Sequence, residues 1–340
     1  SRRSFLKTAA TGAVVSMAMV SAPKDSQAAN EKSSLDSELL LASSASEVTV
    51  DWQAIVKKAS KKALGGGKAG AAAAIVQVCS LMWLRTAMNY QYRYGGNLAT
   101  SLNALYSDGG IPRLYQGLGF ALVQGPATRF FDTASNVGIL ALLESFDETR
   151  SLPLPVKTAV GSAAAGLSRI FLMPVDTSKT AMQVEGADGL ERLWTQVVNE
   201  GPSPLYQGAL ASAAATAAGH FPWFLTYNAL NANLPTVPTD DVLLSLARNA
   251  FMGLCASCVS DCVSNSLRVV KTTKQTASLS KDGVTADKLS YPETVALILE
   301  TDGIIGLLGR GLQTRLLTNM IQGALFSVLW KYFQTVGGLQ

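Results

Sequence analysis

The chain has little histidine, cysteine or charge. Its 340 residues include one histidine and four cysteines, and charged residues make up 15%, against about 25% in typical soluble proteins. One histidine argues against His-rich metal sites and against a Ser-His-Asp enzyme, so we expect no enzymatic activity and no cofactor. The net charge of +4 is too small to indicate a nucleic-acid partner. The shortage of charge points instead to a membrane protein or to an unusually large apolar core.

Three of the four cysteines, Cys255, Cys258 and Cys262, share the spacing of one helix face. A structural zinc site needs four ligands, and the sequence offers no second Cys-x-x-Cys pair and no nearby histidine. Small apolar packing residues are the better interpretation, and we expect no metal site.

The first thirty residues are typical of a targeting segment. Arg2 and Arg3 precede an apolar run that reaches about residue 22 and gives way to small residues near position 28. This order is typical of a twin-arginine export signal, and a generic targeting or unstructured leader is the alternative. Residues 31–60 are polar and are interpreted as a linker. The main domain is expected at residues 61–340.

Six apolar segments of about 25 residues fill the main domain, and each is long enough to cross a bilayer. None is uniformly apolar, because each contains Gly, Pro, Ser, Thr or a charged residue. A membrane helix with a polar stripe must face protein or water-filled space, so the pattern favours a transporter-like, all-α bundle. The segments cover residues 66–93, 117–144, 155–184, 208–233, 242–273 and 311–336.

The segments pair into three repeats. An acid-glycine turn precedes every second segment, and a glycine opens that segment, at Gly117, Gly208 and Gly311. Each repeat is expected to hold two membrane helices and one short amphipathic helix. The expected repeats cover residues 61–146, 153–235 and 240–338. The expected short helices lie near residues 97–105, 190–199 and 291–300.

A proline-acid-base motif ends the first segment of each repeat, in one intact and two degraded copies. The second repeat carries it in full, from Pro174 through Asp176 to Lys179. The degraded copies end at Arg85 in the first repeat and at Arg268 in the third. Together with the three acid-glycine turns, this motif resembles that of the mitochondrial carrier family, in a divergent form.

The resemblance covers residues 66–336 and implies a fold. That fold is an all-α membrane protein with six transmembrane helices in three pseudo-threefold repeats and short amphipathic helices on the matrix side. The resemblance also implies a monomer that transports a small-molecule metabolite and contacts membrane lipid in the mitochondrial inner membrane. The twin-arginine leader indicates a plastid envelope or thylakoid membrane instead, and both locations stay open.

The resemblance also implies a gate. Proline kinks a helix by removing a backbone hydrogen bond, and in the family the acid of one repeat pairs with the base of the next. This implies a pair between Asp176 and Arg268. The first repeat lacks an acid for Lys179, and Asn265 could only hydrogen-bond Arg85, so one ionic link of three survives. The implied network on the matrix side is Arg85, Pro174, Asp176, Lys179, Asn265 and Arg268.

The opposite gate resembles the family less. The family places an aromatic-acidic phrase late in the second helix of each repeat, and no carboxylate remains at these positions. Hydrogen bonds between Asn, Gln and Lys could close it more weakly, so this gate could open without a counter-substrate. The residues of this second gate are Asn136, Asn228, Asn231, Lys331 and Gln334.

Polar residues at mid-membrane depth are the candidate substrate contacts, with interhelical hydrogen bonding as the alternative. Arg129 and Asp132 lie one turn apart and could neutralise each other, whereas Arg315 has no obvious local acid. His220 in an apolar helix is more often a packing residue than a ligand. If the basic residues face the cavity, an anion such as a di- or tricarboxylate is favoured. The candidates are Gln124, Arg129, Thr216, His220, Arg315, Thr318 and Asn319.

A second function stays open. The degraded motifs of the first and third repeats also fit a scaffold or interaction protein that kept the carrier fold and lost its gates. The polar residues at mid-membrane depth favour the transporter.

Overall fold

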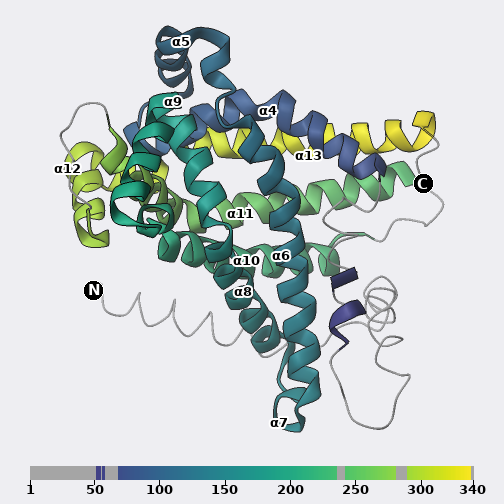
Figure 1. The fold of residues 1–340 in the computed structure, drawn as a ribbon. Helices are drawn as coiled ribbons and strands as arrows, with labels where there is room; N and C mark the ends of the chain where they lie inside the picture. The colour runs from purple at the N-terminus through teal and green to yellow at the C-terminus, as the bar shows by residue number, and fades with distance from the viewer. Residues whose placement is uncertain (1–50, 55, 58–67, 236–241, 281–288, 338–340) are drawn as a thin grey trace, which may run out of the picture. The chain divides into compact units, whose positions relative to one another are not determined.

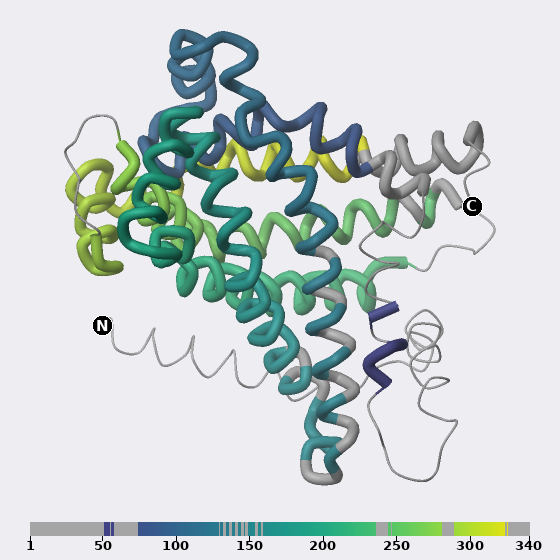
Figure 2. The backbone as a smooth tube through the Cα atoms, in the orientation of Figure 1, coloured from purple at the N-terminus to yellow at the C-terminus, as the bar shows by residue number. Residues whose placement is uncertain are grey.

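The computed structural model describes residues 51–54, 56–57, 68–235, 242–280 and 289–337. Every regular element within these ranges is a helix. The predicted leader and nearly all of the predicted linker lie outside the described residues, so both stay predictions, as do the repeat boundaries. Figure 2 follows the Cα path and shows these residues, and others whose side chains are not described, in grey.

Long helices make up most of the described chain (Figure 1). In chain order the helices are α4 (Lys68–Tyr94), α5 (Leu98–Leu114), α6 (Leu118–Ser145), the short α7 (Asp147–Arg150), α8 (Leu154–Phe171), α9 (Met173–Glu200), α10 (Ala209–Asn233), α11 (Val242–Thr276), α12 (Tyr291–Gly309) and α13 (Leu312–Gly337). Short 3-10 turns, Ser203–Tyr206 and Ala277–Leu279, follow α9 and α11.

The chain divides into two compact units. One comprises Val50–Asn228 and Thr236–Gln340, and all the contacts below belong to it. The other comprises Ser1–Thr49 and Ala229–Pro235, of which only the last seven residues, at the end of α10, are described.

The predicted apolar segments correspond to helices. Five of them match α4, α6, α10, α11 and α13 to within about three residues at either end, the usual uncertainty of helix boundaries. The remaining segment, residues 155–184, is divided between α8 and α9. By hydropathy, none of the described helices is both long enough and apolar enough to cross a membrane. The arrangement of six membrane spans therefore stays a prediction.

Pro174 explains why one segment is divided. It lies in the first turn of α9, where its missing N–H is tolerated, and Leu172 joins the two helices. Continuing α8 through this point would place the proline ring against the carbonyl one turn earlier. The corresponding segments of the other repeats have no such proline, and α4 and α11 run unbroken for 27 and 35 residues.

The three predicted short helices lie within α5, α9 and α12, which are longer than the predicted ranges and are interrupted by glycines. Gly186 has a φ of 82° inside α9, and Gly303 has a φ of 65° inside α12. Each turns the chain from one helical run into the next, because this left-handed conformation favours glycine. The expected helix at 97–105 extends as α5 to Leu114 across a kink at Gly110.

Helices from different repeats pack together. Figure 1 shows α4 beside α13, and the two helices are in extensive contact although they lie at opposite ends of the main domain. α11 contacts α4, α9, α12 and α13. An apolar cluster of Tyr92, Ala211, Val269 and Ile298 joins α4, α10, α11 and α12. This packing brings side chains from all three repeats to one cavity.

Candidate functional site

The glycines that open α6, α10 and α13 make the same contact in each repeat. Gly117, Gly208 and Gly311 all have positive φ, between 66° and 84°. A Cβ atom added at any of them would lie 3.0–3.2 Å from a backbone oxygen of the next repeat, with the third repeat contacting the first. A side chain there would be both strained and crowded. The oxygens belong, in that order, to Lys179, Lys271 and Met88.

These contacts correct the alignment of the repeats. Lys179, Lys271 and Met88 hold equivalent positions in the second, third and first repeats. The sequence-based alignment instead matched Lys179 with Arg268 and Arg85, three residues too early in both other repeats. It followed the last base of each degraded motif, but the equivalent position in the first repeat is a methionine.

The corrected register changes which residues stand where the motif places its acid. Asp176 lies three residues before Lys179, and the same step from Met88 and Lys271 leads to Arg85 and Arg268. Two of the three acid positions therefore hold arginine. The single carboxylate of the network comes from the second repeat.

Asp176 is the centre of this network. Its carboxylate is buried and lies 2.5 Å from Lys271 Nζ and 3.1 Å from Lys179 Nζ. It also accepts hydrogen bonds from Gln124 Nε2 at 2.6 Å and from Gln275 Nε2 at 3.2 Å. A buried carboxylate with two ammonium partners and two amide donors is well satisfied. It ties the second repeat to α6 of the first and α11 of the third.

The predicted pair between Asp176 and Arg268 is wrong. The partner repeat was right, but the base is Lys271, one helical turn later. Arg268 Nε instead donates to Ser264 Oγ on its own helix at 3.3 Å. The error follows directly from the three-residue shift of register.

The predicted hydrogen bond between Asn265 and Arg85 is also wrong. Asn265 Nδ2 donates to two carbonyl oxygens near the end of α12, those of Leu308 at 2.9 Å and Arg310 at 3.1 Å. Asn265 thus satisfies backbone groups and does not line the cavity. Arg85 Nη2 donates to Gln322 Oε1 at 2.9 Å and does line it.

Arg315 has an acid partner that the sequence did not reveal. Its Nε lies 2.5 Å from Asp261 Oδ1, on α11, and Asn319 Nδ2 donates to the other carboxylate oxygen. Arg315 Nη1 also reaches Tyr92 Oη at 3.5 Å. Arg315 thus has no acid close by in the sequence, and its partner comes from another helix.

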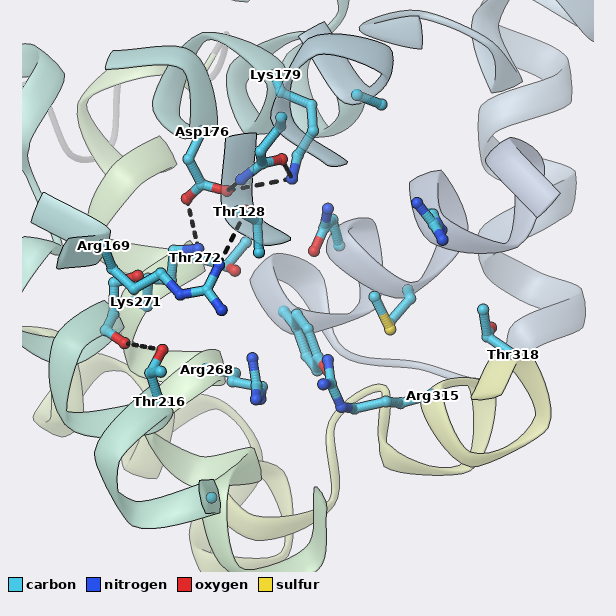
Figure 3. Close-up of a pocket in the computed structure, with 18 of the residues that line it drawn as sticks. Thr128, Arg169, Asp176, Lys179, Thr216, Arg268, Lys271, Thr272, Arg315 and Thr318 are labelled. Atoms are coloured by element: carbon cyan, nitrogen blue, oxygen red, sulfur yellow. Dashed lines mark hydrogen bonds and ion pairs between the residues drawn. The ribbon is translucent and has the colours of Figure 1, made fainter. Parts of the chain in front are cut away.

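A cavity of 410 Å³ lies between the helices of all three repeats. Figure 3 shows Asp176 between Lys179 and Lys271, with Arg268 and Arg315 elsewhere on the wall. Among the described residues, its lining holds one carboxylate and six basic side chains. Even with Asp261 behind Arg315, cations are in excess. The cationic lining residues are Arg85, Arg169, Lys179, Arg268, Lys271 and Arg315.

Most of the predicted substrate residues meet at this cavity. Two of these residues use their hydroxyl groups in hydrogen bonds to the backbone of their own helices. Thr216 Oγ donates to Ser212 O at 3.0 Å, and Thr318 Oγ donates to Thr314 O at 2.6 Å. The side chain of Arg129 lies outside the described residues. The predicted contacts that line the cavity are Gln124, Thr216, His220, Arg315, Thr318 and Asn319, and the gate residues that do so are Arg85, Asp176, Lys179 and Arg268.

The predicted opposite gate can be followed at two positions. Asn228 is exposed and Asn231 is half-buried. Directly before Asn228 in the chain, the ring of Tyr227 stacks on Trp223, whose indole N–H donates to Ser257 on α11 at 3.3 Å. This gate stays a prediction, because the remaining predicted side chains, Asn136, Lys331 and Gln334, lie outside the described residues.

Sequence reasoning missed three charged residues of the site. Lys271 was hidden by the misaligned register, and Asp261 pairs with a residue 54 positions away. Arg169 lies within the apolar part of α8, where it donates to Thr128 Oγ at 2.9 Å and lines the cavity. A charge inside an apolar segment was the available signal. Among the described residues, no group of His, Cys, Asp or Glu side chains could hold a metal ion.

These features define a class of helical protein in which repeats close cyclically around a polar, cationic cavity. The family described as mitochondrial carrier protein matches residues 150–237 and 243–337, more than half of the chain. The chain belongs to the mitochondrial carrier family. The matched regions coincide with the second and third repeats. No curated protein sequence matches the chain.

Family membership carries a coarse functional statement. Members are transporters rather than enzymes, they move solutes across a membrane, and they typically occupy the inner mitochondrial membrane. The chain is therefore assigned to solute transport by a repeat-built membrane carrier.

Proposed function

We propose that the chain transports a small anionic metabolite through the 410 Å³ cavity by alternating access. The observation that carries this proposal is the charge of the lining, in which the described residues supply six basic side chains and one carboxylate. Cations that are removed from bulk water are costly unless anions neutralise them. A substrate that brings negative charge repays this cost, whereas a cationic substrate would add to it.

The chemistry of the lining favours carboxylate or phosphate groups. Four of the six basic residues are arginines, whose planar guanidinium matches an oxyanion with two parallel hydrogen bonds. Gln124 and Asn319 add amide groups, and His220 adds an imidazole. Short di- and tricarboxylates fit both this chemistry and the size of the cavity.

The Asp176 network supplies one gate of the cycle. It joins Gln124 on α6, Asp176 on α9 and Lys271 on α11, so it holds three helices of three repeats together. Substrate binding offsets the loss of these contacts, and the helices then move apart at this end. The divided helix α8–α9 offers a joint at Leu172 for this movement.

Uptake into proteoliposomes tests the proposal. The full chain would be assayed with radiolabelled mono-, di- and tricarboxylates and inorganic phosphate, each with and without internal counter-substrate. We expect saturable uptake of at least one anion, reduced about tenfold or more by Arg268→Gln, which removes a charged hydrogen-bond donor. Arg150→Gln, at the exposed end of α7, is the matched control and should transport normally. An uptake rate that is the same in Arg268→Gln as in the wild type would contradict the proposal.

The same preparation separates the transporter from a transport-inactive scaffold. A scaffold would show neither uptake nor stabilisation by any metabolite in a thermal-shift screen. Fluorescent tagging of the full open reading frame would separate an inner mitochondrial membrane from a plastid envelope or thylakoid membrane.

A further inference from the structure

A buried acid lies directly behind two of the residues that line the cavity. Asp261, on α11, has 5% of its side-chain surface exposed, against 18% for its partner Arg315 on α13. Arg315 (Figure 3) and Asn319 belong to the cavity lining, whereas Asp261 does not. A substrate in the cavity therefore meets the two α13 side chains, and Asp261 can act on it only through them.

The single carboxylate of Asp261 holds both side chains. Its Oδ1 lies 2.5 Å from Arg315 Nε, and its Oδ2 accepts a hydrogen bond from Asn319 Nδ2. The two partners are four residues apart on α13 and so lie on the same helix face. Because a carboxylate paired with a guanidinium only accepts hydrogen bonds, the Asn319 amide turns its nitrogen toward Asp261 and its oxygen away.

The helix that carries Asp261 is packed closely at this level. The preceding residue, Ser260, donates from Oγ to Gly219 O on α10 at 2.8 Å. A Cβ atom added at Gly219 would lie 2.9 Å from that hydroxyl oxygen, so α10 and α11 are in close contact here. The carboxylate is thus presented from a fixed backbone, which is the condition for holding other side chains in one orientation.

This arrangement leaves polar atoms of both α13 side chains available to a ligand. Arg315 Nη1 reaches Tyr92 Oη at 3.5 Å, and Arg315 Nη2 has no hydrogen-bond partner among the residues that the structure describes. The same holds for Asn319 Oδ1 within those residues. A guanidinium that is already held from behind binds an oxyanion without first losing side-chain freedom, which lowers the cost of binding.

We propose that Asp261 is a positioning residue for the transported anion. It holds Arg315 and Asn319 in the orientation in which they bind a carboxylate or phosphate group of the substrate. This inference rests on the proposed function, because it assigns how one wall of the same cavity recognises the anion. Removing the carboxylate then has two opposed effects, since lost orientation weakens anion binding and lost negative charge strengthens it. The effect of orientation is the larger one.

Uptake kinetics of the full chain in proteoliposomes distinguish orientation from charge. The probes are the radiolabelled carboxylates and the inorganic phosphate of the uptake screen. Asp261→Asn keeps the size of the side chain but turns an amide donor toward one of its two partners. We expect KM for a transported probe to rise about fivefold or more, with a maximal rate within about twofold of the wild type. If Asp261 only neutralised Arg315, KM would fall, and if it only stabilised the fold, KM would not change.

Three further variants sharpen the test. Asp188→Asn makes the same change at an exposed position of α9 and should match the wild type. Asp261→Glu keeps the charge but moves the carboxylate by one methylene, and should raise KM about threefold. Because Asp261 acts through Arg315, the double variant Asp261→Asn with Arg315→Lys should have a KM within about twofold of the higher single value.

The outcomes separate this inference from the proposed function. A KM of Asp261→Asn at or below that of the wild type, or effects that multiply in the double variant, would overturn the inference while transport by the wild type still supports the proposed function. If Asp261→Asn does not fold, an unchanged KM in Asp261→Glu overturns the inference, as does failure of both variants to fold. A wild type that carries none of the probes contradicts the proposed function itself. The probe with the larger change in KM identifies the oxyanion that Arg315 binds.

Discussion

The second repeat and its two neighbours carry the same architecture with opposite chemistry. The second has Pro174, a divided helix and the only acid of the described gate network, whereas α4 and α11 are continuous and place arginines at the acid position. At this position one repeat thus supplies a carboxylate, and the other two supply arginines to the cavity wall. The difference teaches that a degraded motif can still contribute to the site, because the arginine that replaces its acid changes the charge of the cavity.

Removing the acid of the second repeat should have the largest effect. Asp176→Asn leaves Lys179 and Lys271 without their buried counter-ion, and breaking a buried pair in this way costs about 3–5 kcal/mol. We expect a large fall in the midpoint of thermal unfolding and loss of transport. Adding Lys271→Met to this variant should recover part of the stability. Equal stability of Asp176→Asn and the wild type would remove Asp176 from the centre of the network.

Exchanging the helix break between repeats should have the next largest effect. Ser266→Pro introduces into continuous α11 the proline that Pro174 provides at the equivalent place in the second repeat, and should cost about 3 kcal/mol. Pro174→Ala should change stability by less than about 1 kcal/mol, because the proline lies in the first turn of α9, and should slow transport by stiffening the joint. Chemical unfolding and uptake rates would check both changes. Equal costs for the two variants would show that the break does not depend on proline.

The glycine contacts between repeats come third. Gly208→Ala adds a Cβ 3.0 Å from the backbone oxygen of Lys271 at a φ of 79°, so crowding and strain together should cost about 1–3 kcal/mol. Gly201→Ala shows the cost of strain without crowding, because Gly201 has a φ of 80° and a ψ of −164° but open space around it. Its strain alone should cost about 1–3 kcal/mol, since this conformation is nearly restricted to glycine. Equal stability of Gly208→Ala and the wild type would mean that contact between the repeats does not require glycine.

The smallest effect is expected from pH, through Glu185 in the second repeat. Burial raises the pKa of Glu185, one residue beyond the predicted span 155–184, while a hydrogen bond from Tyr94 Oη at 2.6 Å opposes the rise. Above the ordinary pKa of an unfolded glutamate, the folded state therefore holds this proton more tightly than the unfolded state. Stability should fall as pH rises from the ordinary pKa of glutamate to the raised pKa of folded Glu185. Glu185→Gln should make this fall smaller. Unfolding midpoints measured from pH 4 to pH 8 would check this, and parallel curves for the two proteins would contradict it.

The sequence predicted the helices better than their register. Apolar runs and glycine turns locate helix ends, because burial and backbone conformation are local properties. The register of α4 and α11 depends on which backbone oxygen meets Gly311 or Gly208, and no local pattern reports that contact. The available sequence signal, the last base of each motif, failed because Met88 replaces the base in the first repeat.

The same reason explains the outcome for the site. Polar positions on the second helix of each repeat, such as Gln124 and Thr318, line one cavity, because equivalent positions in repeats converge, and their contact with a substrate stays a prediction. The partner of Arg315 was missed, because Asp261 lies on α11 and the pair forms only once the third repeat has folded. Sequence periodicity predicts which residues face inward, whereas packing decides which of them pair.

The most direct measurement compares two four-carbon solutes of opposite charge. Uptake of succinate and of the four-carbon diamine putrescine would be measured at pH 7 in proteoliposomes that contain the full chain. The excess of arginine and lysine around the cavity predicts saturable uptake of succinate and none of the diamine. Faster uptake of the diamine, abolished by Asp176→Asn, would contradict the account.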